Sequence, residues 1–120
     1  MSGVAVVTTA HGRHDHLRRQ RVSLAAGTVV PDVHVVVAMD DPAVAGVAVG
    51  DGPPVEVLAV GRDPLGLPLA AARNLGMAHA ARAGCDVLIG LDVDCLAGPT
   101  MVAGYAATVR DDPAAVWSGP

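Results

Sequence analysis

The fold is decided by one stretch of the chain, residues 69–96, which reads LAAARNLGMAHAARAGCDVLIGLDVDCL. Its first half predicts a helix that begins at Pro68 and ends at Gly84, because proline suits the first turn of a helix and glycine suits its end. Small and apolar residues recur on one face of this helix: Leu69, Ala72, Gly76 and Ala80. The apolar run at residues 87–91 then predicts a buried strand, and a helix followed by such a strand is typical of a parallel sheet.

Three more apolar runs of strand length lie upstream, at residues 4–10, 33–39 and 55–60. They are continuous rather than alternating, which is the pattern expected of strands buried on both faces of a parallel sheet. The four runs together predict four strands of one sheet.

The segments between the runs predict the connections. Residues 14–27 predict a helix with His14 or Asp15 as its N-cap, Leu17 and Leu24 on one face, and Gly27 as its stop. Residues 40–54 read DDPAVAGVAVGDGPP, and this richness in glycine and proline predicts a turn and a loop.

The residues after the fourth run complete the fold prediction. Pro99 introduces a last helix that should run to about Asp112 and stop at Pro113. Strands that alternate with helices predict an α/β fold, with an open, mostly parallel, Rossmann-like sheet and flanking helices, in one domain over residues 1–120. Such sheets bind ligands outside the carboxyl ends of their strands.

Composition excludes several functions. All eight basic residues are arginine, so the chain lacks the lysine of a Walker phosphate loop or of a Schiff-base enzyme. The formal net charge of -4 argues against a nucleic-acid partner, which would need a basic face. Arg18, Arg19 and Arg21 are therefore interpreted as a solvated helix face.

The cysteines and the apolar segments indicate the compartment. Cys85 and Cys95 do not form a disulfide framework, and no leader opens the chain, so a cytoplasmic protein is expected. Residues 95–109 are uncharged but too short to cross a bilayer. We expect Cys95 to be a small buried residue rather than a nucleophile.

Two carboxylates follow the fourth strand directly, at Asp92 and Asp94. If the alternation of the strand continues, both side chains leave the same side of the chain and converge. Mg²⁺ and Mn²⁺ favour such oxygen ligands and commonly bind through one or two carboxylates, with substrate phosphates and waters completing the shell. The pair therefore predicts a Mg²⁺ or Mn²⁺ site that neutralises a departing diphosphate.

Other strand ends carry further candidates for binding a nucleotide. Asp40 and Asp41 follow the second strand, where a carboxylate can accept a hydrogen bond from a base or ribose hydroxyl, or can cap the turn before a proline. Arg73 lies near the inner face of its helix and should either bridge to the acidic pair or meet a phosphate.

The first strand is followed by His11 and Arg13, where a histidine ring can stack on a base or have no role in binding. A zinc site built from His11, His14 and His16 is not favoured, because the chain shows no pattern for further ligands. His34 and His79 are expected to be structural.

Taken in order, these segments resemble the amino-terminal half of family 2 glycosyltransferases with the GT-A fold. The matching stretches are VAVVTTAHGRHDHLRRQRVSL (4–24), VHVVVAMDD (33–41) and residues 69–96. The resemblance implies that Asp92 and Asp94 lie at the metal and diphosphate, Asp41 or Asp40 near the nucleoside, and Arg73 near the phosphates. It also implies a UDP- or GDP-linked sugar as the donor and inversion at the transferred sugar, with the acceptor undefined.

In that family the acceptor-binding half and the catalytic base follow the metal motif. The chain is therefore expected to have no catalytic base of its own, and to be either a fragment of a longer enzyme or a domain whose partner half is supplied otherwise. Apolar surface left uncovered by the absent half would promote self-association. A non-catalytic nucleotide-binding or interaction module stays open as the alternative. A nucleotidyltransferase is less favoured. Such an enzyme needs a glycine-rich, basic loop after the first strand, and Gly12 and Arg13 match that loop poorly.

Overall fold

Four parallel strands form the centre of the structure, a computed structural model that describes residues 3–111. They are β1 (Val4–Ala10), β2 (Val33–Met39), β3 (Val55–Val60) and β4 (Val87–Gly90). Their order across the sheet is β3-β2-β1-β4, and every neighbouring pair is parallel. The predicted open parallel α/β sheet is confirmed.

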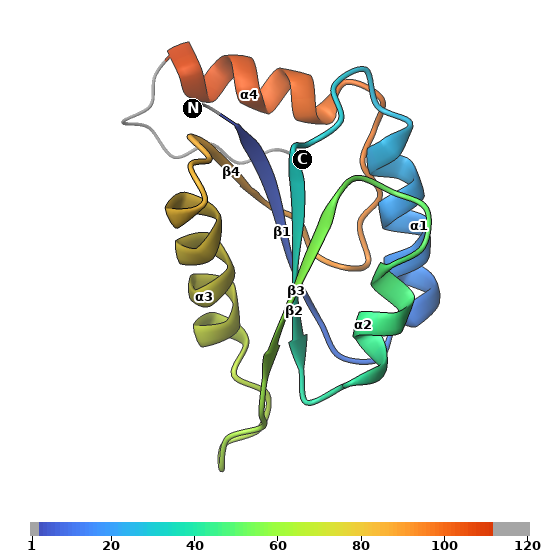
Figure 1. The fold of residues 1–120 in the computed structure, drawn as a ribbon, viewed down its shortest axis with the longest axis vertical. Helices are drawn as coiled ribbons and strands as arrows, with labels where there is room; N and C mark the ends of the chain where they lie inside the picture. Colours follow the sequence, from blue (N-terminus) through green and yellow to red (C-terminus); the bar gives the residue numbers. More distant parts are fainter. Residues whose placement is uncertain (1–2, 112–120) are drawn as a thin grey trace.

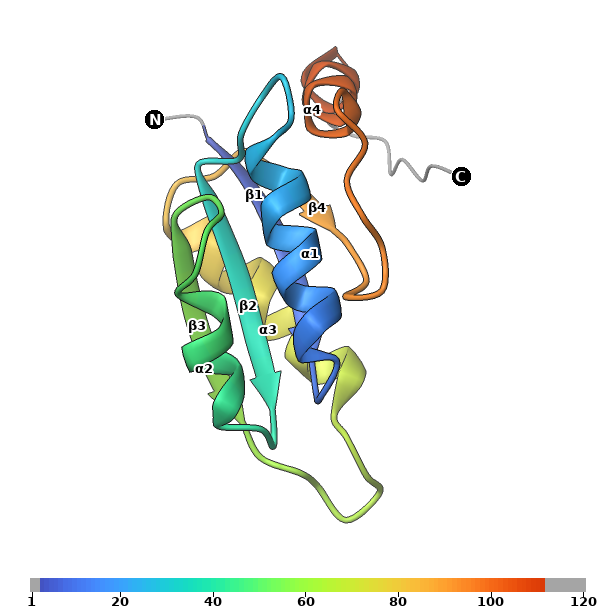
Figure 2. The same cartoon turned by 90° about the vertical axis from the view of Figure 1, so that its right-hand side faces the viewer.

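The helices cover both faces of this sheet. Figure 1 shows α3 (Leu69–Arg82) on one side, with α1 (His14–Ala25) and α2 (Ala43–Ala48) on the other. The last helix, α4 (Met101–Asp111), packs against β4 near the end of the sheet where β1 begins. Figure 2 shows the segment between β3 and α3 projecting beyond the sheet at the opposite end.

The core divides by strand alternation, since successive side chains of a strand point to opposite faces. On the α3 face, Val7, Val35 and Val37 pack against the small residues Ala72 and Ala80. On the other face, two further clusters join the sheet to α1, α2 and α4. Small aliphatic side chains in the strands therefore let the helices approach the sheet closely, most of all at Gly76, where an added Cβ would lie 2.5 Å from Val7 Cγ1.

Two of the sequence predictions about helices are wrong in detail. Residues 43–48 form the short helix α2 instead of a loop, because Val44 and Ala48, four residues apart, are both buried against the sheet. At α1, the N-cap position belongs to Arg13 rather than to His14 or Asp15, and no side chain caps the helix there.

The ends of the other elements follow the prediction closely. β4 ends one residue early, at Gly90, and Leu69 on the predicted inner face of α3 is half exposed. The predicted end of the last helix at Asp112 and its stop at Pro113 lie outside the described residues. Within residues 3–111, no helix is long and apolar enough to cross a membrane.

Candidate ligand site at the carboxyl rim

The direction in which the strands are added reverses at β1. The chain moves from β1 outward to β2 and β3, then returns across the sheet through α3 to place β4 on the other side of β1. Loops that follow β1 and β4 therefore diverge at this switch point, which is where open α/β sheets bind ligands. We call the loops after the four strands, residues 11–13, 40–42, 61–68 and 91–96, the carboxyl rim.

The predicted acidic pair lies at this switch point, but in a turn. The Cys95 N–H donates to the Asp92 carbonyl at 2.9 Å, which closes a β-turn over residues 92–95. The strand alternation expected to continue through Asp92 and Asp94 does not reach them, because β4 has already ended at Gly90. We call residues 92–95 the acidic turn; Asp92 and Asp94 in it are both exposed.

Each of the two carboxylates is paired with a different arginine. Arg13 donates from Nη1 to Asp94 Oδ1 at 3.1 Å, and Arg73 Nη2 lies 3.9 Å from Asp92 Oδ1. The structure thus brings Arg13, Arg73 and the acidic pair together, as expected for Arg73. All four side chains are about half exposed or more, so these are surface ion pairs that a ligand can replace.

The loop after β1 has an uncommon backbone. Arg13 has a φ of 53° directly after Gly12 with a φ of 63°, and Asp40 in the loop after β2 has a φ of 49°. Among the described residues, Arg13 and Asp40 are the two non-glycine residues with positive φ, and both lie on the carboxyl rim. Backbone strain of this kind collects at binding sites, where it fixes side chains in place.

Asp41 joins the loops after β1 and β2. Its Oδ2 accepts hydrogen bonds from the Gly12 N–H and from His14 Nε2, both at 2.8 Å, and its Oδ1 accepts from the Ala43 N–H at 3.2 Å. The hydrogen bonds from His14 and Gly12 hold the pKa of the Asp41 carboxyl below its usual value. These contacts match the capped-turn interpretation, and contact with a nucleoside stays a prediction.

The remaining predicted binding residues lie on the same rim. The exposed His11 donates from Nδ1 to the Met39 carbonyl at 2.7 Å, which ties the first loop to the end of β2. Asp40 accepts a hydrogen bond from Arg62 Nε at 3.1 Å, farther along the rim near β3. Four of the five acids on the rim, Asp40, Asp41, Asp92 and Asp94, have a basic partner within the chain, while the Asp63 carboxylate accepts a hydrogen bond from the Leu65 N–H.

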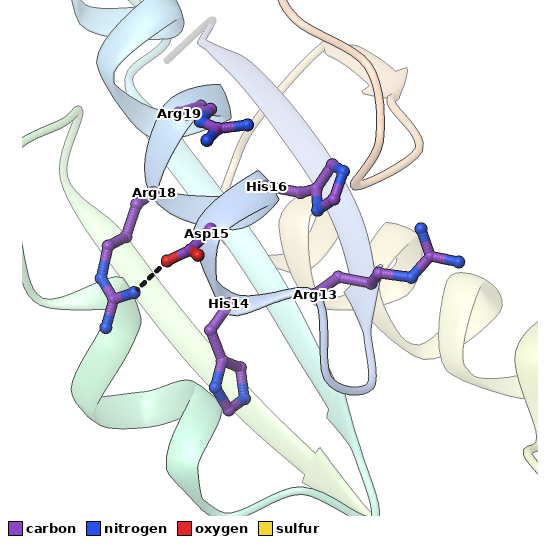
Figure 3. A pocket seen from close by; sticks show the side chains of 6 residues that line it. All are labelled: Arg13, His14, Asp15, His16, Arg18 and Arg19. Atoms are coloured by element: carbon purple, nitrogen blue, oxygen red, sulfur yellow. Dashed lines mark hydrogen bonds and ion pairs between the residues drawn. The ribbon is translucent and has the colours of Figure 1, made fainter.

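An open pocket adjoins the rim at the start of α1. Figure 3 shows its lining, which is mostly basic: Arg13, His14, Asp15, His16, Arg18 and Arg19. Arg18 donates to Asp15 at 2.8 Å within the pocket, while Arg13 extends away from the others (Figure 3). The pocket places positive charge beside the switch point, next to the acidic turn that Arg13 contacts.

Sequence reasoning missed a buried polar cluster beneath the rim. Four polar side chains between the sheet and α1 are at most 2% exposed: Thr8, Gln20, Arg21 and His34. The interpretation of Arg21 as part of a solvated helix face is wrong, whereas Arg18 and Arg19 are exposed as predicted. The available signal was position, because Gln20 and Arg21 fall between Leu17 and Leu24 on the apolar stripe of α1.

The metal prediction meets a donor set that is small but chemically suitable. No group of three or more histidine, cysteine, aspartate or glutamate side chains is gathered for a metal in the part of the chain that the structure describes. The acidic turn supplies two exposed carboxylates, and Mg²⁺ or Mn²⁺ commonly takes no more than that from the protein. The two side chains are thus of the type that such a cation takes, and metal binding at the acidic turn stays a prediction.

The prediction that Cys95 is buried is wrong, whereas the position of His34 agrees with the structural role predicted for it. Cys95 is exposed rather than buried, because the acidic turn carries it off the sheet, and Cys85 is half-buried. Burial, together with nearby carboxylates, raises the pKa of the Cys85 thiol. His34 has the structural position predicted for it, while His79 pairs with Glu56 on the surface.

Comparison with known proteins does not identify a family: no family model matches the sequence, and no curated protein matches it.

Proposed function

We propose that this chain binds a nucleoside diphosphate sugar, UDP- or GDP-linked, at the switch point between β1 and β4, as the donor half of a metal-dependent glycosyltransferase. The observation that carries the proposal is the contact between Arg13 and Asp94. It joins a cation from the loop after β1 to an acid from the loop after β4, at the place where sheets of this kind bind ligands.

The acidic turn provides the metal-binding part of the proposed site. Asp92 and Asp94 would hold Mg²⁺ or Mn²⁺ together with the diphosphate of the donor. A cation bound there supplies charge neutralisation for the leaving diphosphate. Carboxylates already partnered by arginine are suited to this exchange, because metal binding releases Arg13 and Arg73 to meet phosphate oxygens.

Transfer to an acceptor needs groups beyond this donor site. The resemblance that motivates the proposal places the acceptor-binding half and the catalytic base after the acidic motif, and it implies inversion at the transferred sugar. The part of the chain described here is thus proposed to bind donor and metal, in the cytoplasm, where an exposed thiol such as that of Cys95 stays reduced.

Calorimetric titration tests the proposal. A panel of UDP- and GDP-sugars is titrated with and without Mn²⁺ into the wild-type chain and into Asp92→Asn and Asp94→Asn. We expect binding that requires Mn²⁺ and that falls at least tenfold in either variant, because each loses a charged metal ligand.

The matched control is Asp86→Asn. Asp86 also pairs with an arginine, Arg110, at 3.2 Å and with similar exposure, but it lies at the amino end of β4. This variant should bind donor as the wild type does. Donor binding that does not depend on Mn²⁺, or that is weakened equally by all three substitutions, would contradict the proposal.

A non-catalytic interaction module is the second candidate, and two observations favour it. Four of the five acids on the carboxyl rim already have a basic partner, and Leu65 and Leu96 on the same rim are 99% and 61% exposed. Such a module would show no donor binding in the titrations and would self-associate through its apolar surface. The titrations separate the two candidates, and sizing chromatography of the wild type against Leu65→Ser and Leu96→Ser tests the self-association.

A further inference from the structure

A continuous chain of hydrogen bonds runs beneath the carboxyl rim, from α1 through β2 and β1 and back to the acidic turn. Arg21 Nη1 lies 3.0 Å from His34 Nδ1, and His34 Nε2 lies 2.9 Å from Thr8 Oγ1. The Thr8 hydroxyl donates to Gln20 Oε1 at 2.8 Å. Gln20 Nε2 then donates to the carbonyls of Asp92 and Cys95, at 2.7 and 2.9 Å.

Each hydrogen bond in this buried polar chain fixes the direction of the next. Arginine can only donate, so His34 accepts at Nδ1 and carries its proton on Nε2. The Nε2–H donates to Thr8, whose hydroxyl proton is then directed to Gln20 Oε1. With its oxygen committed to Thr8, the Gln20 amide presents both N–H groups to the acidic turn.

His34 stays neutral in this arrangement. Burial and the neighbouring charge of Arg21 lower its pKa from 6.5 to about 3. A proton on Nδ1 would face the Arg21 guanidinium and would break the first hydrogen bond of the chain.

The far end of the chain is anchored without a carboxylate. Arg21 Nη2 donates to the Pro53 carbonyl at 2.8 Å, while Arg21 Nε is buried with no hydrogen-bond partner among the described residues. A buried arginine without an acid is costly for stability, and apolar side chains on the stripe of α1 would avoid that cost. The arrangement therefore calls for a role other than packing.

We propose that Gln20 is a positioning residue that holds the acidic turn in place for ligand binding, and that Thr8, His34 and Arg21 fix its orientation. The consequence for donor binding rests on the function proposed above, whereas the effect on the turn can be measured without any ligand. Gln20 bonds both carbonyls that flank Asp94, so it sets where the backbone of that residue lies.

Amide hydrogen exchange measured by NMR tests the positioning directly. The Cys95 N–H closes the acidic turn. The Ala97 N–H in the same loop is an internal reference, because it bonds Ser23 Oγ at 2.9 Å and that hydroxyl contacts only the backbone carbonyl of Gln20, which the substitution keeps. In Gln20→Met, which keeps the size of the side chain, Cys95 should exchange at least about tenfold faster relative to Ala97 than in the wild type.

A second pair of variants keeps the test valid if Gln20→Met does not fold. Thr8→Val removes the hydroxyl that orients Gln20 and should also speed exchange at Cys95, while Thr8→Ser keeps the hydroxyl and should restore the wild-type rate. Val37→Ala, in the core cluster on the α3 face of the sheet, which contains no residue of the acidic turn, is the control for general loss of stability. It should leave the ratio of the Cys95 and Ala97 rates unchanged.

Donor titration with Mn²⁺ gives the functional readout. Thr8→Val should weaken binding severalfold and Thr8→Ser should not. If the wild type binds no donor, the proposed function fails while the exchange rates still decide the positioning role. Equal Cys95 to Ala97 ratios in the wild type, Thr8→Val and Gln20→Met would overturn the inference, and so would the same change in Val37→Ala.

Discussion

Acid should destabilise this protein through His34, well above the pH at which carboxylates titrate. The ring is buried, and its pKa falls from 6.5 in the unfolded chain to about 3 in the folded protein. As the pH falls below 6.5, His34 takes up a proton in the unfolded chain but stays neutral in the folded protein. The stability that comes from the neutral ring is complete above pH 6.5 and is lost as the pH falls from there toward 3.

The size of this loss follows from the two pKa values. Linkage gives about 2 kcal/mol of unfolding free energy lost between pH 7 and pH 5. A small domain has a total stability of about 5–15 kcal/mol, so the effect is readily measured. Carboxylates in an unfolded chain titrate near pH 4, and they contribute little over this range.

Urea denaturation at pH 7, 6 and 5, at constant ionic strength, measures the loss. His34→Gln offers one acceptor and one donor group but cannot take up a proton, so its unfolding free energy should change by less than about 0.5 kcal/mol over the same range. His16→Gln is the control for the removal of one histidine, because His16 is half-buried in the pocket at the start of α1. Equal losses in the wild type and in His34→Gln would refute the reasoning.

Four further substitutions test the packing and the surface charges. Gly76→Ala should lower the unfolding free energy by about 1–3 kcal/mol despite the better helix propensity of alanine, because the new Cβ would lie 2.5 Å from Cγ1 of the buried Val7. Gly104→Ala, with open space around it in α4, should instead raise the unfolding free energy by up to about 1 kcal/mol. Thermal denaturation compares the two variants. Gly52→Ala should destabilise by about 1–3 kcal/mol, since φ is 149° and the Cβ would lie 2.8 Å from Arg21 Cζ; an unchanged urea midpoint would contradict this. Asp94→Asn should change the unfolding free energy by no more than about 1 kcal/mol, because its ion pair is exposed, so any loss of Mn²⁺-dependent donor binding in this variant cannot be a loss of folding.

The carboxyl rim of the structure is balanced by charge pairs. Arg13 holds Asp94, Arg73 lies near Asp92, and Arg62 holds Asp40. This arrangement keeps exposed acids from repelling one another in the absence of a ligand, and it keeps cations close to the point where a phosphate would bind. The proposed site thus needs a ligand that offers both a cation for the acids and an anion for the arginines, as a metal-bound diphosphate does.

The strands and the main helices could be predicted because their signals are local. Four apolar runs bounded by glycine, proline and charged residues gave β1, β2 and β3 to the residue and β4 to within one residue. The helix at 43–48 was missed because its stability comes from burying two side chains on the sheet, and composition alone does not contain that contact.

What the sequence determined by itself is the order of buried strands and amphipathic helices, and with it the rim on which the predicted site residues fall. Hydrophobic periodicity and turn residues set the conformation of a few neighbouring residues, so they can be recognised in a single sequence. Only the tertiary structure decided which acid meets which arginine, that the acidic pair sits in a turn, and that Thr8, Gln20, Arg21 and His34 join in one buried chain. These contacts join side chains 12 to 81 residues apart, and their partners are chosen by the packing of α1 and α3 on the sheet rather than by any local preference.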